Sequence, residues 1–391
     1  MSGILFWLCV LIIIYVYAGY PLLVTVLARL RPAQTKRSGH TPSVTLLIAA
    51  YNEESVIAGK LENSLALDYP REQLQILVAA DGSDDQTAEI VRSFADRGIE
   101  LSYDPARRGK LAAINRAMQQ VRNEIVVFSD ANNIYDAQTL SILVQPFADP
   151  TVGATTGSKN IIKAGSQLAQ ADGLYWRYES FIKEQETRLG CCVGVAGEIF
   201  AIRQALYTRP PDKIINDDFF IALNIIKQGF RIAYVPEARS SEAASLNEDD
   251  ELVRRTRIVA GRYQAMSYSL SHLPFHQPLV VWQILSHKFL RPLIPFAMIG
   301  ALVANLAALV FSSSQTPGWL FLSPPIGAIL FVLQLGFYLL AWFGMKIKPG
   351  GLIGKVIYLP TFLVNSNYAA LLGLIRYMTG KQTVLWKKVS R

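Results

Sequence analysis

Long uncharged hydrophobic runs at the two ends of the chain flank a central region in which short apolar runs alternate with amphipathic ones. Neither Met1–Ala28 nor Pro292–Met345 contains Asp, Glu, Lys or Arg. An apolar run of about 20 residues is long enough to cross the hydrocarbon core of a bilayer as a helix. The pattern therefore predicts an N-terminal membrane helix and a C-terminal helical hairpin, with the hairpin turn at Ser312–Trp319.

A cleaved signal peptide is the alternative for the first run. It would need a basic start, a shorter apolar run and a small-residue cleavage site, whereas here the start is uncharged and the run is long. Basic residues follow it at Arg29, Arg31, Lys36 and Arg37. We therefore expect residues 1–30 to be a retained anchor, with the next segment in the cytoplasm by the positive-inside rule.

Two further segments beside the hairpin (residues 292–345) are apolar but interrupted. Residues 272–291 mix aliphatic side chains with His287, Lys288 and Arg291, which is typical of an interfacial helix. Residues 346–391 contain Pro360 and end in a basic tail. If the stretch 356–375 spanned the membrane, that tail would lie outside, against the charge rule. An interfacial or re-entrant segment is therefore preferred there to a transmembrane one.

The central region, residues 41–271, shows the alternation of an α/β domain. Buried-type strands are expected to start at Ser43, Leu74, Ile99 and Glu124. Stretches with helical periodicity, residues 54–69, 88–98 and 109–121, separate them. Strands that alternate with helices predict a doubly wound, mainly parallel sheet.

Three polar clusters directly follow these strands: YNEE at 51–54, DGSDD at 81–85 and SDANN at 129–133. The carboxyl ends of parallel strands share one edge of a sheet, where ligands bind. Asp, Asn, Gly and Ser are common in turns, so a turn would explain any one cluster alone. A turn explains less well why three clusters rich in carboxylates lie on the same edge of the sheet. The chain has no G-x-G-x-x-G after its first strand and no P-loop motif. A phosphorylated ligand on such a rim requires a divalent cation between carboxylate and phosphate.

These motifs, in their order, resemble those of glycosyltransferase family 2, which has the GT-A (Rossmann-like) fold. Besides the three clusters, the matching stretches are RRGKLAAIN (107–115), GEIFAIR (197–203) and INDDFFIALNIIKQGFR (215–231). The resemblance spans residues 43–264. The flanking hydrophobic segments are similar to those of membrane-bound polysaccharide synthases of the family. The resemblance to this family implies a GT-A domain on the cytoplasmic side, with transmembrane helices before and after that domain.

The resemblance implies a nucleotide site at the first two clusters. Asp81 would contact the uracil ring of a UDP-sugar, and Tyr51 and Glu53 would line the nucleoside pocket; alternatively, Glu53 only favours a helix N-terminus. Lys110 starts a predicted helix, where a cation is unfavourable unless an anion lies beside it, so we expect Lys110 near the nucleotide. Asp130 would contact the diphosphate.

The third cluster corresponds to the D-x-D metal motif of the family, with Asp130 as first and Asn132 as second ligand. Mg²⁺ and Mn²⁺ both accept carboxylate and amide oxygens. Because an amide replaces a carboxylate, we expect metal binding to be weak without nucleotide. The identity of the metal, Mg²⁺ or Mn²⁺, stays open.

Asp218 is the candidate general base, which would deprotonate the acceptor hydroxyl during an inverting transfer. A neighbouring like charge, Asp217, is expected to raise one of the two carboxyl pKa values and to support Asp218. The alternative is a helix cap formed by Asn216 and Asp217, without chemistry.

The acceptor and diphosphate side is expected to involve Gly197, Glu198, Arg254 and Arg257. Processive family members carry Q-x-x-R-W, where this chain has RRTRI at 254–258. Arg257 keeps the arginine, which is suited to clamping a diphosphate, but the stacking tryptophan is missing. Processive synthesis is therefore less certain than sugar transfer, and a basic face against lipid headgroups is the alternative for RRTRI.

The net charge of +8 does not predict nucleic-acid binding here, because much of it flanks membrane segments, where anionic lipids are the natural partner. Cys191 and Cys192 are expected to be reduced packing residues.

Together these observations predict an inverting glycosyltransferase in a membrane, expected to be a bacterial inner membrane. It would move a hexose or N-acetylhexosamine from a UDP-sugar to a growing polysaccharide or a lipid-linked glycan. An export partner or a homo-oligomer would supply what three or four spans lack for a polymer channel. The alternatives are single-sugar transfer to a lipid-linked acceptor and a non-catalytic, nucleotide-sensing membrane scaffold.

Overall fold

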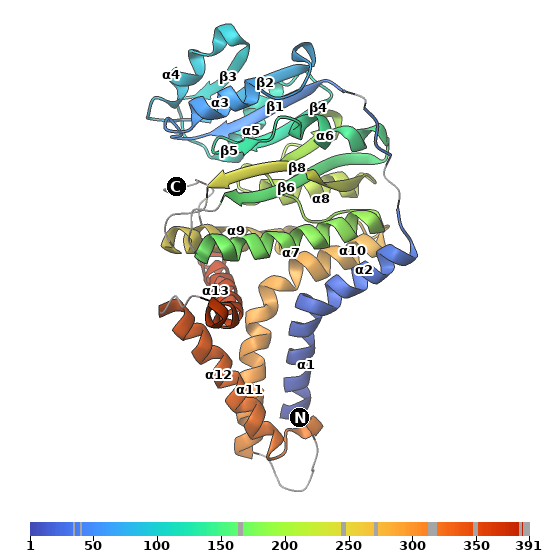
Figure 1. Ribbon diagram of the computed structural model, residues 1–391, viewed down its shortest axis with the longest axis vertical. Helices are drawn as coiled ribbons and strands as arrows, with labels where there is room; N and C mark the ends of the chain where they lie inside the picture. Colours follow the sequence, from blue (N-terminus) through green and yellow to red (C-terminus); the bar gives the residue numbers. More distant parts are fainter. Residues whose placement is uncertain are drawn as a thin grey trace.

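In the computed structural model, a mixed eight-stranded sheet occupies the upper part of the protein in Figure 1, above a group of long helices. The structure describes residues 1–33, 36–39, 41–162, 167–243, 248–269, 273–311, 319–346, 351–382 and 385. The predicted hairpin turn, apart from Trp319, and most of the basic tail lie outside these residues.

The strand order across the sheet is β3-β2-β1-β4-β7-β6-β8-β5. The strands are β1 Val44–Ala50, β2 Leu74–Asp81, β3 Ile99–Asp104, β4 Ile125–Asp130, β5 Asn133–Tyr135, β6 Val152–Ile162, β7 Phe200–Arg203 and β8 Arg231–Ala243. The first four run parallel, as the alternating pattern predicts, and β6 is parallel to β8. Strand β7 is antiparallel to both of its neighbours, and β5 is antiparallel to β8.

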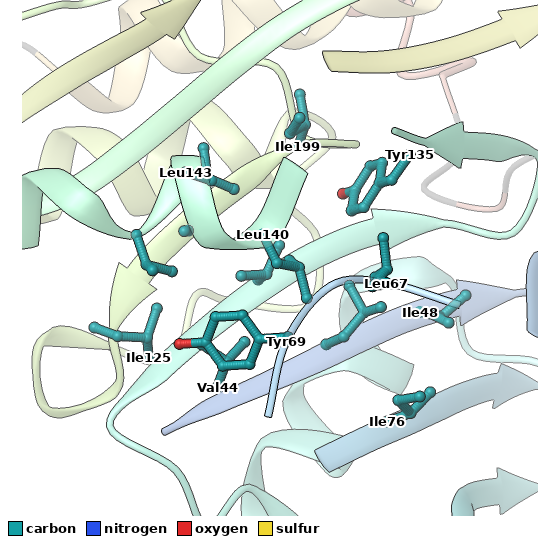
Figure 2. Packing of buried hydrophobic residues seen from close by; sticks show 14 of the residues in the cluster. Val44, Ile48, Leu67, Tyr69, Ile76, Ile125, Tyr135, Leu140, Leu143 and Ile199 are labelled. Atoms are coloured by element: carbon teal, nitrogen blue, oxygen red, sulfur yellow. The ribbon is translucent and has the colours of Figure 1, made fainter. Parts of the chain in front are cut away.

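Both faces of β1, β2 and β4 are buried, which explains why these strands are mainly apolar, whereas the edge strand β3 is partly exposed. In β1, Leu46 and Ile48 face one core and Leu47 and Ala49 face the other. Figure 2 shows the first core, where Val44, Ile48 and Ile125 pack with residues such as Tyr69 and Leu140. Helices α3 (Ile57–Leu65) and α6 (Thr139–Leu143) cover this face. Helices α5 (Lys110–Ala117) and α8 (Asp217–Lys227) cover the opposite face.

The strand register places the ends of β1, β2 and β4 side by side. Ala50 pairs with Ala80, which precedes Asp81, and Ala49 pairs with Asp130. The three polar clusters therefore start at one edge of the sheet, as the sequence predicts.

Long helices lie beneath the sheet and continue away from it (Figure 1). The remaining helices are α1 Ser2–Ile14, α2 Tyr20–Leu30, α4 Thr87–Arg92, α7 Gln167–Leu189, α9 Glu248–Ser269, α10 Pro278–Ile284, α11 Ile294–Phe311, α12 Ile326–Lys346 and α13 Gly351–Met378. Helix α7 lies between the sheet strands β6 and β8 and helix α2. Helices α1, α11 and α12 form the part farthest from the sheet.

Among the residues that the structure describes, three segments are long and apolar enough to cross a membrane: Ser2–Leu30, Pro278–Phe311 and Ile326–Lys346. The first two segments are bent at π-helical turns. In the first segment the turn Tyr15–Gly19 joins α1 to α2, and in the second the turn Leu285–Phe289 follows α10. Beyond the bend, α2 packs on α7 through the buried residues Tyr20, Val24 and Ala28. The second half of the predicted anchor therefore also packs against the domain that carries the sheet.

The two interrupted segments are both helical. In the predicted interfacial stretch, α10 packs into the second core through Val280 and Ile284. The segment 356–375 belongs to one continuous helix, α13, which contains Pro360 and packs against α9 and α12. Whether α13 spans the bilayer or lies at its surface stays a prediction.

Candidate active site

The loops after β1 and β2 are joined by hydrogen bonds that use most of their polar groups. Asn52, in the left-handed region at φ 53°, exchanges hydrogen bonds with Asp84. The Glu53 amide donates to Thr87 Oγ1 at 2.8 Å, and the Glu54 amide donates to Asp85 Oδ2 at 3.2 Å. These are hydrogen bonds of the kind found in turns, and they hold the two loops against each other.

Asp81, at the end of β2, is fully buried and holds the loop that precedes α5. Its Oδ1 accepts the backbone N–H of Arg108 at 2.8 Å, and its Oδ2 accepts that of Gly109 at 2.9 Å. Gly82 follows at φ 58°, where an added Cβ would lie 2.6 Å from the Arg107 nitrogen. The guanidinium of Arg107 stacks 3.9 Å from the Tyr51 ring centroid. Sequence reasoning missed this loop-holding role of Asp81, and its contact with a uracil ring stays a prediction.

Lys110, the first residue of α5, reaches the end of β4. Its Nζ donates to Asp130 Oδ1 at 2.5 Å. Burial disfavours the charge of Lys110, but the carboxylates of Asp130, Asp217 and Asp218 together raise its pKa above the ordinary value. The lysine is therefore a permanent cation that links the predicted metal motif to the predicted base.

Asp217 and Asp218 begin α8 and line the same depression as Lys110 and Gly197. Burial and the neighbouring charge of Asp217 raise the pKa of the Asp218 carboxyl. One of its oxygens accepts the amide of Phe219 at 2.7 Å. A Cβ on Gly197 would lie 3.2 Å from the Asp218 Cβ, so the glycine leaves the carboxylate room.

The helix-cap alternative for this region is wrong as regards Asn216. Its side chain makes no capping bond to α8, and instead donates to the Ile258 carbonyl of α9 at 3.0 Å. This contact ties the start of α8 to the helix that carries the RRTRI motif.

Arg257 of α9 lines the adjoining depression together with Lys110 and Asp217. Burial lowers its pKa, while the charges of Asp217, Asp130 and Asp218 act in the opposite direction. The structure therefore brings Arg257 to the site. Arg254, one turn away, is close enough to Lys159 for their charges to interact.

Glu198 belongs to a buried ion cluster behind Asp130. Its side chain is 9% exposed and accepts from Lys159 at 2.5 Å, while Lys159 also pairs with Glu242. Burial raises the pKa of Glu198, Lys159 opposes this effect, and Glu242 and Asp130 add to it. The expected acceptor role of Glu198 stays a prediction, whereas its neighbour Gly197 does face the site.

Asn133, the last residue of the SDANN cluster, is part of the core. It is fully buried, and its side chain accepts from Lys60 at 2.7 Å and donates to Ser240 at 2.8 Å. Burial lowers the pKa of Lys60 to about 7. The lysine at position 60 stands on the apolar face of α3, which was the signal that sequence reasoning overlooked. Asn132, in contrast, is only partly buried.

Metal ligands are few in this region. Within the described ranges, no group of three His, Cys, Asp or Glu side chains is placed to hold a metal ion. Asp130 and Asn132 supply oxygen ligands of the type that Mg²⁺ and Mn²⁺ prefer. This set fits a cation only when further oxygens, such as those of a diphosphate, complete the coordination.

Beneath the site, the turns that follow α10 are joined to α7 by buried pairs of acidic and basic side chains that the sequence did not reveal. His287 lies with Nδ1 2.7 Å from Glu186 and Nε2 3.1 Å from Glu179. Arg291 pairs with Glu179, and the Tyr20 hydroxyl donates to Glu186 at 2.5 Å. The polar side chains of the predicted interfacial helix thus turn toward α7, and His287 is only 1% exposed.

Three comparisons with known proteins agree on the family. The model of "Glycosyltransferase like family 2" matches residues 42–264. The chain is 29% identical over 201 residues to the poly-beta-1,6-N-acetyl-D-glucosamine synthase of Staphylococcus aureus (strain COL), covering 50% of this chain and 48% of that protein. It is 26% identical over 219 residues to the probable glycosyltransferase YdaM of Bacillus subtilis (strain 168), covering 50% of each. The chain thus spans about half the length of these curated relatives.

Among solved structures, the mannosyltransferase PcManGT from Pyrobaculum calidifontis, in complex with GDP-Man and Mn²⁺, has the same fold. The match covers 96% of this chain and 99% of that chain, with a TM-score of 0.70 and 23% identity. It therefore extends over the membrane-type helices as well as the sheet. With a matching family model over more than half of its length and a GT-A-type sheet, the chain belongs to glycosyltransferase family 2.

Proposed function

We propose that the protein is an inverting glycosyltransferase that moves a hexose or N-acetylhexosamine from a UDP-sugar to a membrane-bound glycan acceptor. The acceptor would be a growing polysaccharide or a lipid-linked glycan at the cytoplasmic face. The observation that carries this proposal is the single depression in which Lys110 and Asp218 meet beside Gly197. A permanent cation for a leaving diphosphate and a carboxylate of raised pKa for a hydroxyl lie in one place.

The proposed reaction uses these groups in a defined way. Asp218 accepts the proton of the acceptor hydroxyl while that oxygen bonds to the anomeric carbon. The bond from the anomeric carbon to the diphosphate oxygen breaks on the opposite face, which inverts the configuration. Lys110 and Arg257 stabilise the negative charge on the departing nucleoside diphosphate.

The proposed cation site consists of Asp130 and Asn132 together with the donor diphosphate. A bound Mg²⁺ or Mn²⁺ would neutralise charge on the leaving group. Exchanging Asn132→Asp should tighten Mn²⁺ binding in the absence of nucleotide, because a second carboxylate replaces an amide. Calorimetry with Mn²⁺ alone measures this effect, and unchanged affinity would argue against Asn132 as a ligand.

The acceptor alternatives stay distinct. The Staphylococcus aureus relative is described as a polymer synthase, which favours a growing polysaccharide here. Ile258 stands where processive members of the family have Trp, so the aromatic ring on which an acceptor sugar could stack is missing. This difference favours single-sugar addition to a lipid-linked acceptor. Chain-length analysis of the product separates the two.

A nucleotide-release assay tests the proposal. The full-length protein in detergent, with Mn²⁺, is offered a panel of UDP-sugars, and GDP-mannose is included because PcManGT was solved with GDP-Man. We expect release from one UDP-sugar and its loss in Asp218→Asn. Full activity of Asp218→Asn would refute the mechanism. Release from GDP-mannose alone would refute the donor assignment, and no release from any donor would favour the scaffold alternative.

A further inference from the structure

Two lysines from different helices converge beneath the proposed base, on the loop that precedes β7. Lys183 lies on α7 and is 3% exposed. Lys288 lies in the π-helical turn after α10. A Cβ built on Gly194 would lie 3.2 Å from Lys288 Nζ and 3.3 Å from Lys183 Cε. Both side chains therefore reach the same short stretch of the loop that precedes β7.

The two ammonium groups share their nearest acids with other basic groups: the charges of Glu179 and Glu186 act on Lys288, but His287 and Arg291 already face these carboxylates. Within the described residues, neither group makes an ion pair or donates a hydrogen bond. The nearest ring contacts of Lys183 are Tyr234 at 5.4 Å and Trp176 at 5.9 Å. The carboxylates nearest to this part of α7, Glu179 and Glu186, are already paired with His287 and Arg291.

A third cation adds to this arrangement. Arg262, on α9, is close enough to Lys288 for their like charges to interact. Like charges that are largely withdrawn from water repel each other, and an anion placed between them offsets this repulsion. An arrangement of this kind is stable when an anion occupies the space between the cations.

The position of the lysines relates them to the acceptor rather than to the donor. The charge of Lys288 acts on Asp218. Gly194 lies three residues before Gly197, the residue that borders Asp218. Lys110 and Arg257, the cations assigned to the nucleotide diphosphate, line separate depressions in which neither Lys183 nor Lys288 takes part.

We infer that Lys183 and Lys288 form a phosphate-binding subsite for an acceptor that carries a phosphate or diphosphate group. The subsite holds the anionic part of the acceptor while its hydroxyl faces Asp218. Lys288 belongs to a segment long and apolar enough to enter a membrane, and α7, α9 and α10 lie between the sheet and the outer helices (Figure 1). A lipid-linked phosphate fits this place. The inference rests on the proposed function, since it names the chemistry of the acceptor.

A binding experiment that needs no turnover tests the subsite. The full-length protein in a neutral detergent is titrated by calorimetry with dodecyl phosphate, dodecanol and inorganic phosphate. Lys183→Met and Lys288→Met remove the charge and keep the hydrocarbon stem. Lys227→Met, at an exposed position on α8, is the matched control. Lys288→Arg keeps the charge and tests for rescue.

We expect dodecyl phosphate to bind more tightly than dodecanol. Each Lys-to-Met variant should weaken its binding by about tenfold to a hundredfold, the range for a charge-assisted hydrogen bond. Lys227→Met and Lys288→Arg should bind like the unmodified protein. Competition by inorganic phosphate at equal concentration would assign the site to soluble phosphate esters, and failure to compete would assign it to lipid phosphates.

Equal binding of dodecyl phosphate by all variants, or no preference over dodecanol, would overturn the inference. Because binding is read without a donor, this result is separate from the failure of sugar transfer. UDP binding in the presence of Mn²⁺ checks that each variant is folded. If Lys183→Met does not fold, Lys288→Met alone decides.

Discussion

Replacing Asp81 with Asn tests whether this buried carboxylate holds the loop that positions Lys110. The substitution keeps the shape of the side chain and one acceptor oxygen. It turns the other oxygen into an amide that faces a backbone N–H. Asp81 accepts the amides of Arg108 and Gly109 at 2.8 and 2.9 Å and is fully buried. A hydrogen bond to a charged group contributes about 1.5–3 kcal/mol, and an unsatisfied buried donor costs about 1–3 kcal/mol.

These values give an expected loss of about 2–4 kcal/mol for local closure of the loop over residues 105–109. Since about 1.4 kcal/mol corresponds to a factor of ten, the loop should open roughly 30- to 1,000-fold more often, up to the limit set by global unfolding. Hydrogen exchange of the nucleotide-free protein measures this opening at the Gly109 amide. Asp96→Asn, at an exposed position, is the control.

The two roles of Asp81 give different results in this assay. If Asp81 holds the loop, exchange accelerates before any nucleotide is added, and the affinity for the donor falls as a consequence. If exchange of the Arg108 and Gly109 amides is unchanged while the donor affinity falls, Asp81 acts only on the base, and the loop-holding role is refuted.

Three further substitutions probe the site and its support. Asp217→Asn removes the neighbouring charge that raises the Asp218 pKa; since the base must be deprotonated, the acid limb of the kcat/KM profile should move to lower pH, and a shift upward would contradict the assignment. Lys159→Met removes the cation that the buried carboxylates of Glu198 and Glu242 share and should lower the free energy of unfolding by about 3–5 kcal/mol, with partial recovery on adding Glu198→Gln. A denaturant titration that finds a loss of less than about 1 kcal/mol, the range for a surface pair, would show that the cluster is not buried in solution. Gly197→Ala places a methyl group 3.2 Å from the Asp218 Cβ and should reduce kcat about tenfold or more with little change in Tm, whereas unchanged kcat would show that Asp218 has room to move.

The sequence predicts the parallel part of the sheet, β1 to β4, because short apolar runs mark the buried strands locally. Val44–Ala50 is apolar except for Thr45, Ile125–Phe128 is wholly apolar, and the two strands pair in parallel as expected. The polar strand ends, and with them Asp130, could be placed on one edge for the same reason. The family motifs then identified Asp218 as the candidate general base. The local sequence alone would also have allowed a helix N-cap at this place.

What the sequence does not reveal depends on partners that are distant along the chain. Asn132 and Asn133 are adjacent and chemically identical, yet Asn133 is buried because Lys60 and Ser240 approach it from other elements. The pairing of Lys159 with Glu242 likewise arises only when β6 and β8 lie side by side. Local periodicity gives the face on which a residue lies, but not the residue it meets there.

The ion pairs between α7 and the α10–α11 segment have a consequence for how the protein is assembled. Glu179 and Glu186 come from the domain that carries the sheet, and their partners His287 and Arg291 come from a segment that is long and apolar enough to cross a membrane. A shortened protein ending after α9 would keep both acids and lose both bases. Loss of these partners should destabilise the domain that carries the sheet, because Glu179 and Glu186 would remain as buried carboxylates without the basic groups that face them.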